Sequence, residues 1–262
     1  MPLDIDRFSH IASPIQRWDP RVKIASLLIL VFGIALLKTI PMAAAALITA
    51  LLLMQLSALP YHFVGHTLQW VVLFLLPFFL ILPFSYPGEA SVHILGLPFA
   101  WEGLRLATLI FIKALAIVIT SFAMFGSSRF DISMIALQRL KCPKIIIQML
   151  LFTYRYTYTF LEEMRRMNTS MMARGFVPGT NGYTLRTYGN FVGTLLIRSF
   201  ERTERIYKAM LSKGYQGEFH TLINFNSNAG DYVKATIVIS ITIGLLGMDI
   251  YGLFPQATAG WY

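Results

Sequence analysis

Five apolar runs in this 262-residue chain each approach or exceed the roughly 20 residues that a helix needs to cross a lipid bilayer. Hydrophobic residues make up 56% of the chain and charged residues only 13%, which is too apolar for a soluble domain of this size. The runs cover residues 22–39, 41–59, 67–86, 102–125 and 232–254. We therefore expect an all-α integral membrane protein with about five transmembrane helices.

The cations are distributed unevenly along the chain. Of the 22 Lys and Arg residues, 14 lie between Arg129 and Lys213, and four more lie at or before the start of the first run. The positive-inside rule places such cation-rich segments in the cytoplasm. Alternation through five spans then leaves the C-terminus outside. We expect a multi-pass protein of the inner (cytoplasmic) membrane with a cytoplasmic N-terminus.

The region between the fourth and fifth runs, residues 126–230, is too long for a connecting loop and too apolar for a disordered one. Its pattern predicts a short helix over about 131–140, a long one over 144–174 and another over 184–213. The expected organisation is therefore three parts: residues 1–125 with four spans, 126–230 with cytoplasmic helices, and 231–262 with the last span and an external C-terminus.

A fifteen-residue segment occurs twice in that cytoplasmic region, 39 positions apart. The copies are EEMRRMNTSMMARGF (162–176) and ERTERIYKAMLSKGY (201–215). Each reads as a helix whose last turn carries a cation, followed at once by Gly and an aromatic residue. Aligned without gaps, the copies share the pairs Glu162/Glu201, Arg166/Arg205, Met171/Met210 and Gly175/Gly214.

Two interpretations of these helix ends compete. Gly just past a helix and a cation in the last turn form an ordinary C-terminal cap, which stabilises a helix by roughly 0.3–1 kcal/mol and needs no partner. Capping, however, places no demand on the matched Glu and Arg residues far upstream. Docking of both ends into two similar sockets on a partner therefore becomes the favoured interpretation. The docking candidates are Ala173, Arg174, Gly175, Ser212, Lys213 and Gly214, and the supporting candidates are Glu162, Arg166, Glu201, Arg205, Lys208, Phe176 and Tyr215.

The chain resembles a known family in four stretches. These are SPIQRWDPRVK (13–23), LFTYRY (151–156) and the two segments 162–176 and 201–219. In order and hydropathy, nearly the whole chain is similar to the transmembrane T components of energy-coupling factor (ECF) transporters, and among these to the cobalt-type component CbiQ.

The resemblance implies a mechanism. In that family two coupling helices end in Ala-Arg-Gly motifs, and each arginine enters a groove on one of two cytoplasmic ATPase subunits. The helices pass the ATPase movement to a separate substrate-binding membrane subunit. Carried over, the first motif is Ala173-Arg174-Gly175. The second is Ser212-Lys213-Gly214, where Lys keeps the charge but loses the planar fork of Arg; Arg205 and Lys208 are expected to share its role.

The resemblance leaves the substrate open. Cobalt is the first expectation, and nickel or a vitamin are the alternatives. The chain has no G-x-x-x-x-G-K-[ST] loop, so ATP and Mg²⁺ are expected on partner subunits and no cofactor on this chain, which we expect not to be an enzyme. A self-sufficient secondary transporter is the rival from another class, but it requires ionisable residues in the spans, and Lys113 stands out there.

Three smaller expectations complete the sequence analysis. Asp19 and Pro20 suit the N-cap and first position of a helix, although a role in positioning the first span against the coupling helices is the alternative. Lys113 is expected to face a polar interior or a partner subunit, with simple packing as the alternative. His62 and His66, four apart in an expected loop, make a weak metal-site candidate without a third ligand, so no metal site is predicted.

Overall fold

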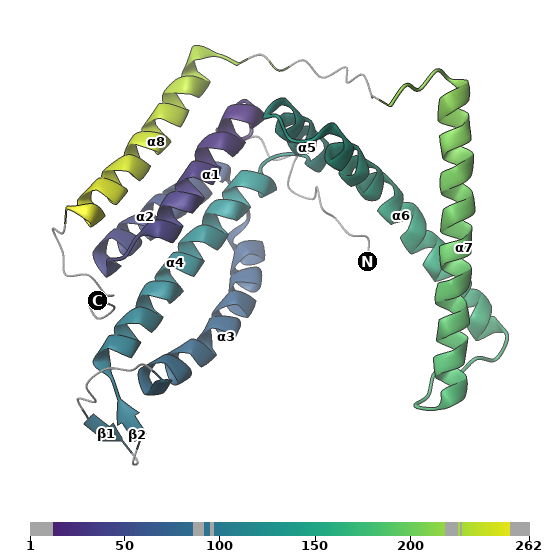
Figure 1. Ribbon diagram of the computed structural model, residues 1–262, viewed down its shortest axis with the longest axis horizontal. Helices are drawn as coiled ribbons and strands as arrows, with labels where there is room; N and C mark the ends of the chain where they lie inside the picture. Colours follow the sequence, from purple (N-terminus) through teal and green to yellow (C-terminus); the bar gives the residue numbers. More distant parts are fainter. Residues whose placement is uncertain (1–12, 86–91, 95–96, 218–224, 226, 252–262) are drawn as a thin grey trace. The chain divides into compact units, whose positions relative to one another are not determined.

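The computed structural model describes residues 13–85, 92–94, 97–217, 225 and 227–251 (Figure 1). The N-terminal dozen residues and the C-terminal segment lie outside this description. By internal packing the chain divides into two compact units. One contains α1–α5, a short β-hairpin and α8, and the other contains α6 and α7. The packing thus groups the short helix near residue 130 with the apolar helices rather than with α6 and α7.

The apolar runs form the helices of the first unit. They are α1 (Pro20–Leu36), α2 (Ile40–Ser57), α3 (Tyr61–Ser85), α4 (Trp101–Gly126) and α8 (Ala229–Ile250), accompanied by α5 (Phe130–Arg139). Within the described residues, α2, α3, α4 and α8 are long and apolar enough to cross a membrane. α1 has 17 residues, about 26 Å along its axis, and is the shortest of the five. The first predicted span is therefore present as a helix of the bundle but is shorter than the other four.

The third predicted span begins earlier than its apolar pattern suggests. We expected a loop around His62 and His66 and a helix from residue 67, but α3 already begins at Tyr61. Pro60 starts the helix, because its carbonyl accepts the N–H groups of Phe63 and Val64. The loop assignment for the two histidines was wrong. Pro77 and Pro83 lie inside α3, which is visibly curved in Figure 1, as helices with internal prolines are.

A two-stranded antiparallel hairpin lies between α3 and α4, where the sequence predicted only a connection. β1 (Val92–Ile94) pairs with β2 (Leu97–Phe99), with Val92 opposite Phe99 and Ile94 opposite Leu97. The hairpin is a minor addition to an all-helical membrane protein.

The start of α1 has the predicted cap. Asp19 is the N-cap residue and Pro20 the first helical residue, and the Asp19 carboxylate accepts the N–H of Arg21 at 2.9 Å. The Arg21 guanidinium returns to the same carboxylate, with Nη2 at 2.8 Å from Oδ2. Nearby, the indole of Trp18 donates to the carbonyl of Asp231 in α8. α1 and α8 therefore begin side by side and run in the same direction.

The far end of α1 is held by two ionisable residues from other helices. Nζ of Lys113 in α4 donates to the carbonyls of Ala35 and Leu37, at 2.6 and 2.8 Å. The buried carboxylate of Asp249 in α8 accepts the backbone N–H groups of Lys38 and Thr39, at 2.8 and 3.0 Å, and the Thr39 hydroxyl at 2.6 Å. A cation thus lies at the C-terminus of α1 and an anion at the N-terminus of α2, which is the favourable arrangement for both helix dipoles.

Lys113 therefore faces a polar interior within its own chain. The sequence analysis overlooked Asp249, although the rule that treats any ionisable residue inside a span as functional would have identified it. Lys23, fully buried near the start of α1, has the corresponding role at the other end of the bundle. Its ammonium group donates to the hydroxyls of Ser127 and Ser128, where α4 ends.

Candidate functional site

The candidate site consists of the C-terminal ends of α6 (Lys144–Ala173) and α7 (Gly182–Ser212). Both helices carry most of their charged residues toward these ends. Their observed limits differ from the predicted ones by one or two residues. The duplicated segments therefore each end a helix.

The end of α6 is a two-hydrogen-bond cap. Arg174 is the C-cap residue, with φ −86° and ψ 12°, and Gly175 follows with φ +81°. The N–H of Phe176 donates to the carbonyl of Met171 at 3.2 Å, and that of Gly175 to Met172 at 3.0 Å. This is the Schellman arrangement, whose left-handed position favours Gly. The Arg174 side chain is exposed beside it.

The end of α7 repeats this geometry. Lys213 is the C-cap residue, with φ −93° and ψ 12°, and Gly214 has φ +81°. The N–H of Tyr215 donates to Met210 at 3.0 Å, and that of Gly214 to Leu211 at 2.9 Å. Lys213 is exposed, like Arg174. The Ser-Lys-Gly sequence therefore forms the same backbone cap as Ala-Arg-Gly, with a lysine in place of the arginine and an added hydroxyl at Ser212.

The aromatic residues that follow the two glycines bind within the α6–α7 unit. Phe176 is buried, and its ring lies edge-on to that of Tyr188 at 5.6 Å and tilted to that of Tyr183 at 6.2 Å. Tyr215 donates its hydroxyl to Oε1 of Gln148, at 3.1 Å. We predicted both as supporting residues of the docking site; Phe176 packs against two tyrosines of α7, and Tyr215 bonds to α6 through its hydroxyl.

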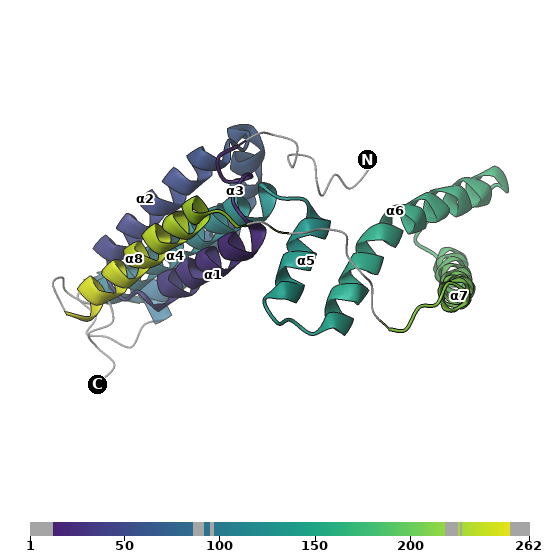
Figure 2. The same ribbon diagram turned by 90° about the horizontal axis from the view of Figure 1, so that it is seen from above.

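α6 and α7 cross obliquely (Figure 1), and Figure 2 shows α7 nearly end-on beside α6. Glu163 of α6 and Arg198 of α7 form an ion pair at the crossing. On one side of it Phe176, just past the end of α6, meets the start of α7. On the other side Tyr215, just past the end of α7, meets Gln148 near the start of α6. Arg174 and Lys213 therefore lie on opposite sides of the crossing.

The predicted supporting charges behave differently in the two copies. In the first, Arg166 pairs with Glu162 one helical turn away, at 2.5 Å. In the second, the guanidinium of Arg205 donates to the backbone carbonyl of Glu201 instead, at 3.3 Å. A further exposed pair joins Lys208 to Glu204 at 2.8 Å, and Ser212 donates its hydroxyl to the carbonyl of Lys208. Exposed pairs of this kind contribute roughly 0.2–1 kcal/mol each, so they are not what holds the unit together.

The sequence analysis missed three residues that organise the site. Glu163 and Arg198 lie outside the matched positions of the duplicated segment, and Gln148 lies in an apolar stretch. Arg198, Arg202 and Arg205 also line a polar cavity of about 280 Å³ with Glu163 and Glu201. A polar residue within an apolar helical run, such as Gln148, is the signal that could have been followed.

Comparison with known proteins decides the family. The sequence model of the CbiQ family, described as cobalt transport protein, matches residues 12–222. This chain belongs to the CbiQ family. It is 21% identical to the energy-coupling factor transporter transmembrane protein EcfT of Heliobacterium modesticaldum, over 82% of this chain and 85% of that protein.

Two further relatives are consistent with this membership. The EcfT protein of Bacillus subtilis is 25% identical over 81% of this CbiQ-family chain and 84% of its own length. The cobalt transport protein CbiQ of Rhodobacter capsulatus is 30% identical, but over 33% of this chain and 35% of its own length. The chain is thus a multi-pass membrane transport component. In its described residues the structure holds no cluster of three or more His, Cys, Asp or Glu side chains that could bind a metal ion.

Proposed function

We propose that this chain is the coupling subunit of an ATP-driven ECF-type importer, in which the ends of α6 and α7 dock two cytoplasmic ATPase subunits. The observation that carries the proposal is the repetition of one cap geometry, with one exposed cation, at two helix ends. A cap needed only for helix stability would not have to be duplicated with its upstream charges. Two matched ends suit two matched partners.

The separation of the two cations supports two sockets rather than one. Arg174 lies 11 residues beyond Glu163, about 16 Å along α6, and Lys213 lies 15 residues beyond Arg198, about 22 Å along α7. Even for helices that cross at a right angle, these two distances place the cations roughly 28 Å apart. A single groove cannot receive both.

Movement of either socket would act on both helices. A charge-assisted pair in a groove holds a helix end more strongly than a neutral hydrogen bond does. The crossing pair Glu163–Arg198 and the Gln148–Tyr215 contact then connect that end to the other helix. In the proposed mechanism, α6 and α7 pass the ATPase movement to a separate substrate-binding membrane subunit, and ATP and Mg²⁺ bind to the ATPases.

The proposed orientation has the N-terminus, α6 and α7 in the cytoplasm and the C-terminus outside. It is supported by the 14 of 22 cations between Arg129 and Lys213. Cobalt is the proposed substrate, on the support of the family's description. Nickel and vitamins are the alternatives, and uptake of radiolabelled cobalt by the reconstituted complex, in competition with nickel, separates them.

The alternative interpretation is a self-sufficient secondary transporter, which requires ionisable residues in the spans that are free to bind a substrate or ion. Ionisable residues that such a transporter could use include Lys113, Asp249 and Lys23. Lys113 and Asp249 hold the junction of α1 and α2, and Lys23 donates to the hydroxyls at the end of α4. The rival predicts uptake by vesicles that contain this chain alone. The coupling proposal predicts uptake only with the ATPases and the substrate-binding subunit present.

Docking is tested by co-purification of the tagged chain with its candidate ATPase subunits. Arg174→Glu and Lys213→Glu should each weaken recovery of the ATPases, and the double variant should abolish it. Arg174→Lys and Lys213→Arg keep the charge and should retain recovery, and Lys141→Glu reverses an exposed charge outside the motifs as a control. Full recovery with a double variant that purifies as a folded, monodisperse protein would reduce both motifs to helix caps.

A further inference from the structure

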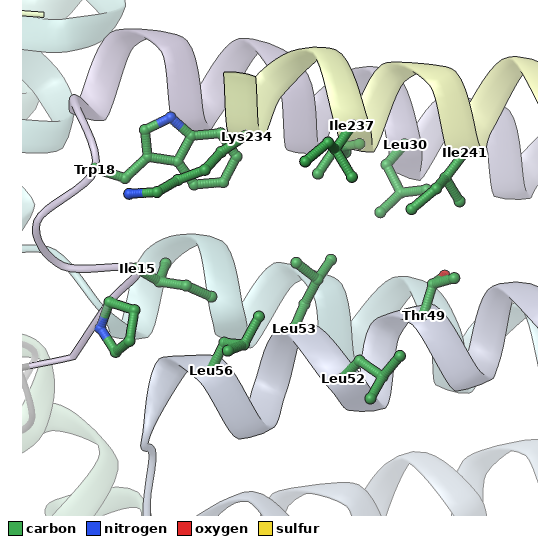
Figure 3. A pocket seen from close by; sticks show the side chains of 12 residues that line it. Ile15, Trp18, Leu30, Thr49, Leu52, Leu53, Leu56, Lys234, Ile237 and Ile241 are labelled. Atoms are coloured by element: carbon green, nitrogen blue, oxygen red, sulfur yellow. The ribbon is translucent and has the colours of Figure 1, made fainter. Parts of the chain in front are cut away.

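An apolar groove runs along the membrane bundle between α2 and α8, with α1 as its floor (Figure 3). Its volume is about 370 Å³. Leu53 of α2 faces Ile237 of α8 across it, and Thr49 and Ile241 mark its far end. From Lys234 to Ile241 the groove follows seven residues of α8, about 10 Å. Its side chains are accessible from the membrane, since Ile237 is 55% exposed.

A lysine, Lys234, lies at the end of the groove opposite Thr49 and Ile241. Lys234 and Trp18 lie together there, as Figure 3 shows. The Lys234 ammonium group forms a long ion pair with Oδ1 of Asp231, at 3.7 Å and beyond hydrogen-bond distance, and its side chain is about half exposed. Asp231 itself completes the capping box at the start of α8. Lys234 therefore retains the capacity to bind an anion at the mouth of the groove.

The polar atoms along the wall are already satisfied. The Thr49 hydroxyl donates to the carbonyl of Ala46 at 2.7 Å, and the Trp18 indole N–H donates to the carbonyl of Asp231. An extended peptide segment in the groove would bring backbone N–H and carbonyl groups that these walls cannot pair. A hydrocarbon chain brings no such groups. The occupant that the walls suit is therefore purely apolar along its length.

We propose that this groove binds one acyl chain of an anionic phospholipid, whose phosphate lies at Lys234. Apolar walls and a single cation at one end match the two parts of such a lipid. In the orientation proposed above, this end faces the cytoplasmic leaflet, where anionic lipids attract basic side chains near the surface. The bound chain fills the space that separates α2 from α8.

Because Trp18 lies in the wall of the groove, quenching of its fluorescence measures directly whether a lipid chain is bound there. With Trp70, Trp101 and Trp261 replaced by Phe, Trp18 is the one tryptophan left of the chain's four. The full chain is reconstituted into bilayers that contain phosphatidylglycerol or phosphatidylcholine with brominated acyl chains, which quench tryptophan on contact. We expect roughly fivefold tighter binding of the phosphatidylglycerol, the effect of one cation near an anionic surface.

Two pairs of variants distinguish quenching by a lipid in the groove from quenching by the surrounding bilayer. Thr49→Phe fills the groove and should reduce quenching by both lipids, whereas Ile48→Phe, on the neighbouring exposed position, should not. Lys234→Ala should remove the preference for phosphatidylglycerol, and Lys234→Arg should keep it. Equal quenching by the two lipids in the unaltered groove, or equal effects of Thr49→Phe and Ile48→Phe, would overturn the proposal. Absence of quenching by either lipid would overturn it as well, because another occupant would then fill the groove.

Discussion

Gln148 and Tyr215 join the beginning of α6 to the chain that leaves α7. Tyr215 donates its hydroxyl to Oε1 of Gln148 at 3.1 Å, and Nε2 of the same amide donates to the carbonyl of Gly217 at 3.0 Å. One side chain thus holds both the aromatic residue after Lys213 and the segment that follows it. The second helix end is positioned by the first helix as well as by its own cap.

Replacement of Gln148 by Leu should therefore loosen the end of α7 without altering α7 itself. Loss of two hydrogen bonds, each contributing about 0.5–1.5 kcal/mol, favours opening of residues 213–217. The expected result is faster tryptic cleavage after Lys213, by roughly tenfold. Tyr215→Phe removes one of the two bonds and should have an intermediate effect. Unchanged cleavage in both variants would show that the cap alone positions this end.

Gly175→Ala tests the cap of α6 without removing its cation. A Cβ at Gly175 would meet no neighbouring atom, so the cost is the left-handed backbone alone, roughly 1–2 kcal/mol. Amide exchange at residues 175 and 176 should accelerate about 5–30-fold, and recovery of the ATPases should fall. Gly189→Ala, inside α7 and equally free of neighbours, should instead stabilise its helix by roughly 0.5–1 kcal/mol. A Gly175→Ala variant that behaves like Gly189→Ala contradicts the requirement for the left-handed cap.

The local features of the fold were predictable because each depends on a few neighbouring residues. A cation followed by Gly and an aromatic residue predicted the C-terminal end of α6 and that of α7. Both glycines have the left-handed conformation. Asp19 and Pro20 predicted the start of α1 in the same way. The length of an apolar run predicted the bundle helices.

The contacts between distant residues were not predictable on that basis. Asp249 and Thr39 are 210 positions apart, and no periodicity relates them. The crossing pair Glu163–Arg198 depends on how two amphipathic faces meet, which helix propensity does not determine. The early start of α3 was missed because the polar His62 and His66 interrupt the apolar signal, while Pro60 still initiates the helix.

Asp249→Ala should destabilise the bundle strongly. It leaves the N–H groups of Lys38 and Thr39 without their acceptor at the start of α2, at a cost of about 3 kcal/mol or more. Thermal unfolding in detergent should show a clear loss, and Lys113→Met a smaller one. The two losses should not add, because Asp249 and Lys113 hold the same junction of α1 and α2. Arg105→Met, at an exposed position of α4, is the control and should have little effect. A wild-type-like Asp249→Ala would show that water replaces the carboxylate.

Asp19 should make stability depend on pH at the acidic end. Burial alone disfavours the carboxylate, but the hydrogen bonds and charge of Arg21 outweigh it and hold the pKa of Asp19 below its ordinary value of 3.8. The stabilisation is therefore present above this value and is lost as the pH falls through the lowered pKa of the folded state. Asn is also a good N-cap residue, so Asp19→Asn keeps the cap and removes the titration.

The measurement is the melting temperature of both proteins in detergent between about pH 5 and pH 3. We expect the wild-type value to fall more steeply than that of Asp19→Asn, so that the difference between the two proteins narrows with acidification. Glu162→Gln, which removes an exposed carboxylate from α6, should follow the wild type. Parallel curves for wild type and Asp19→Asn would mean that the ion pair with Arg21, which also donates to the carbonyl of Phe225 before α8, contributes orientation rather than stability.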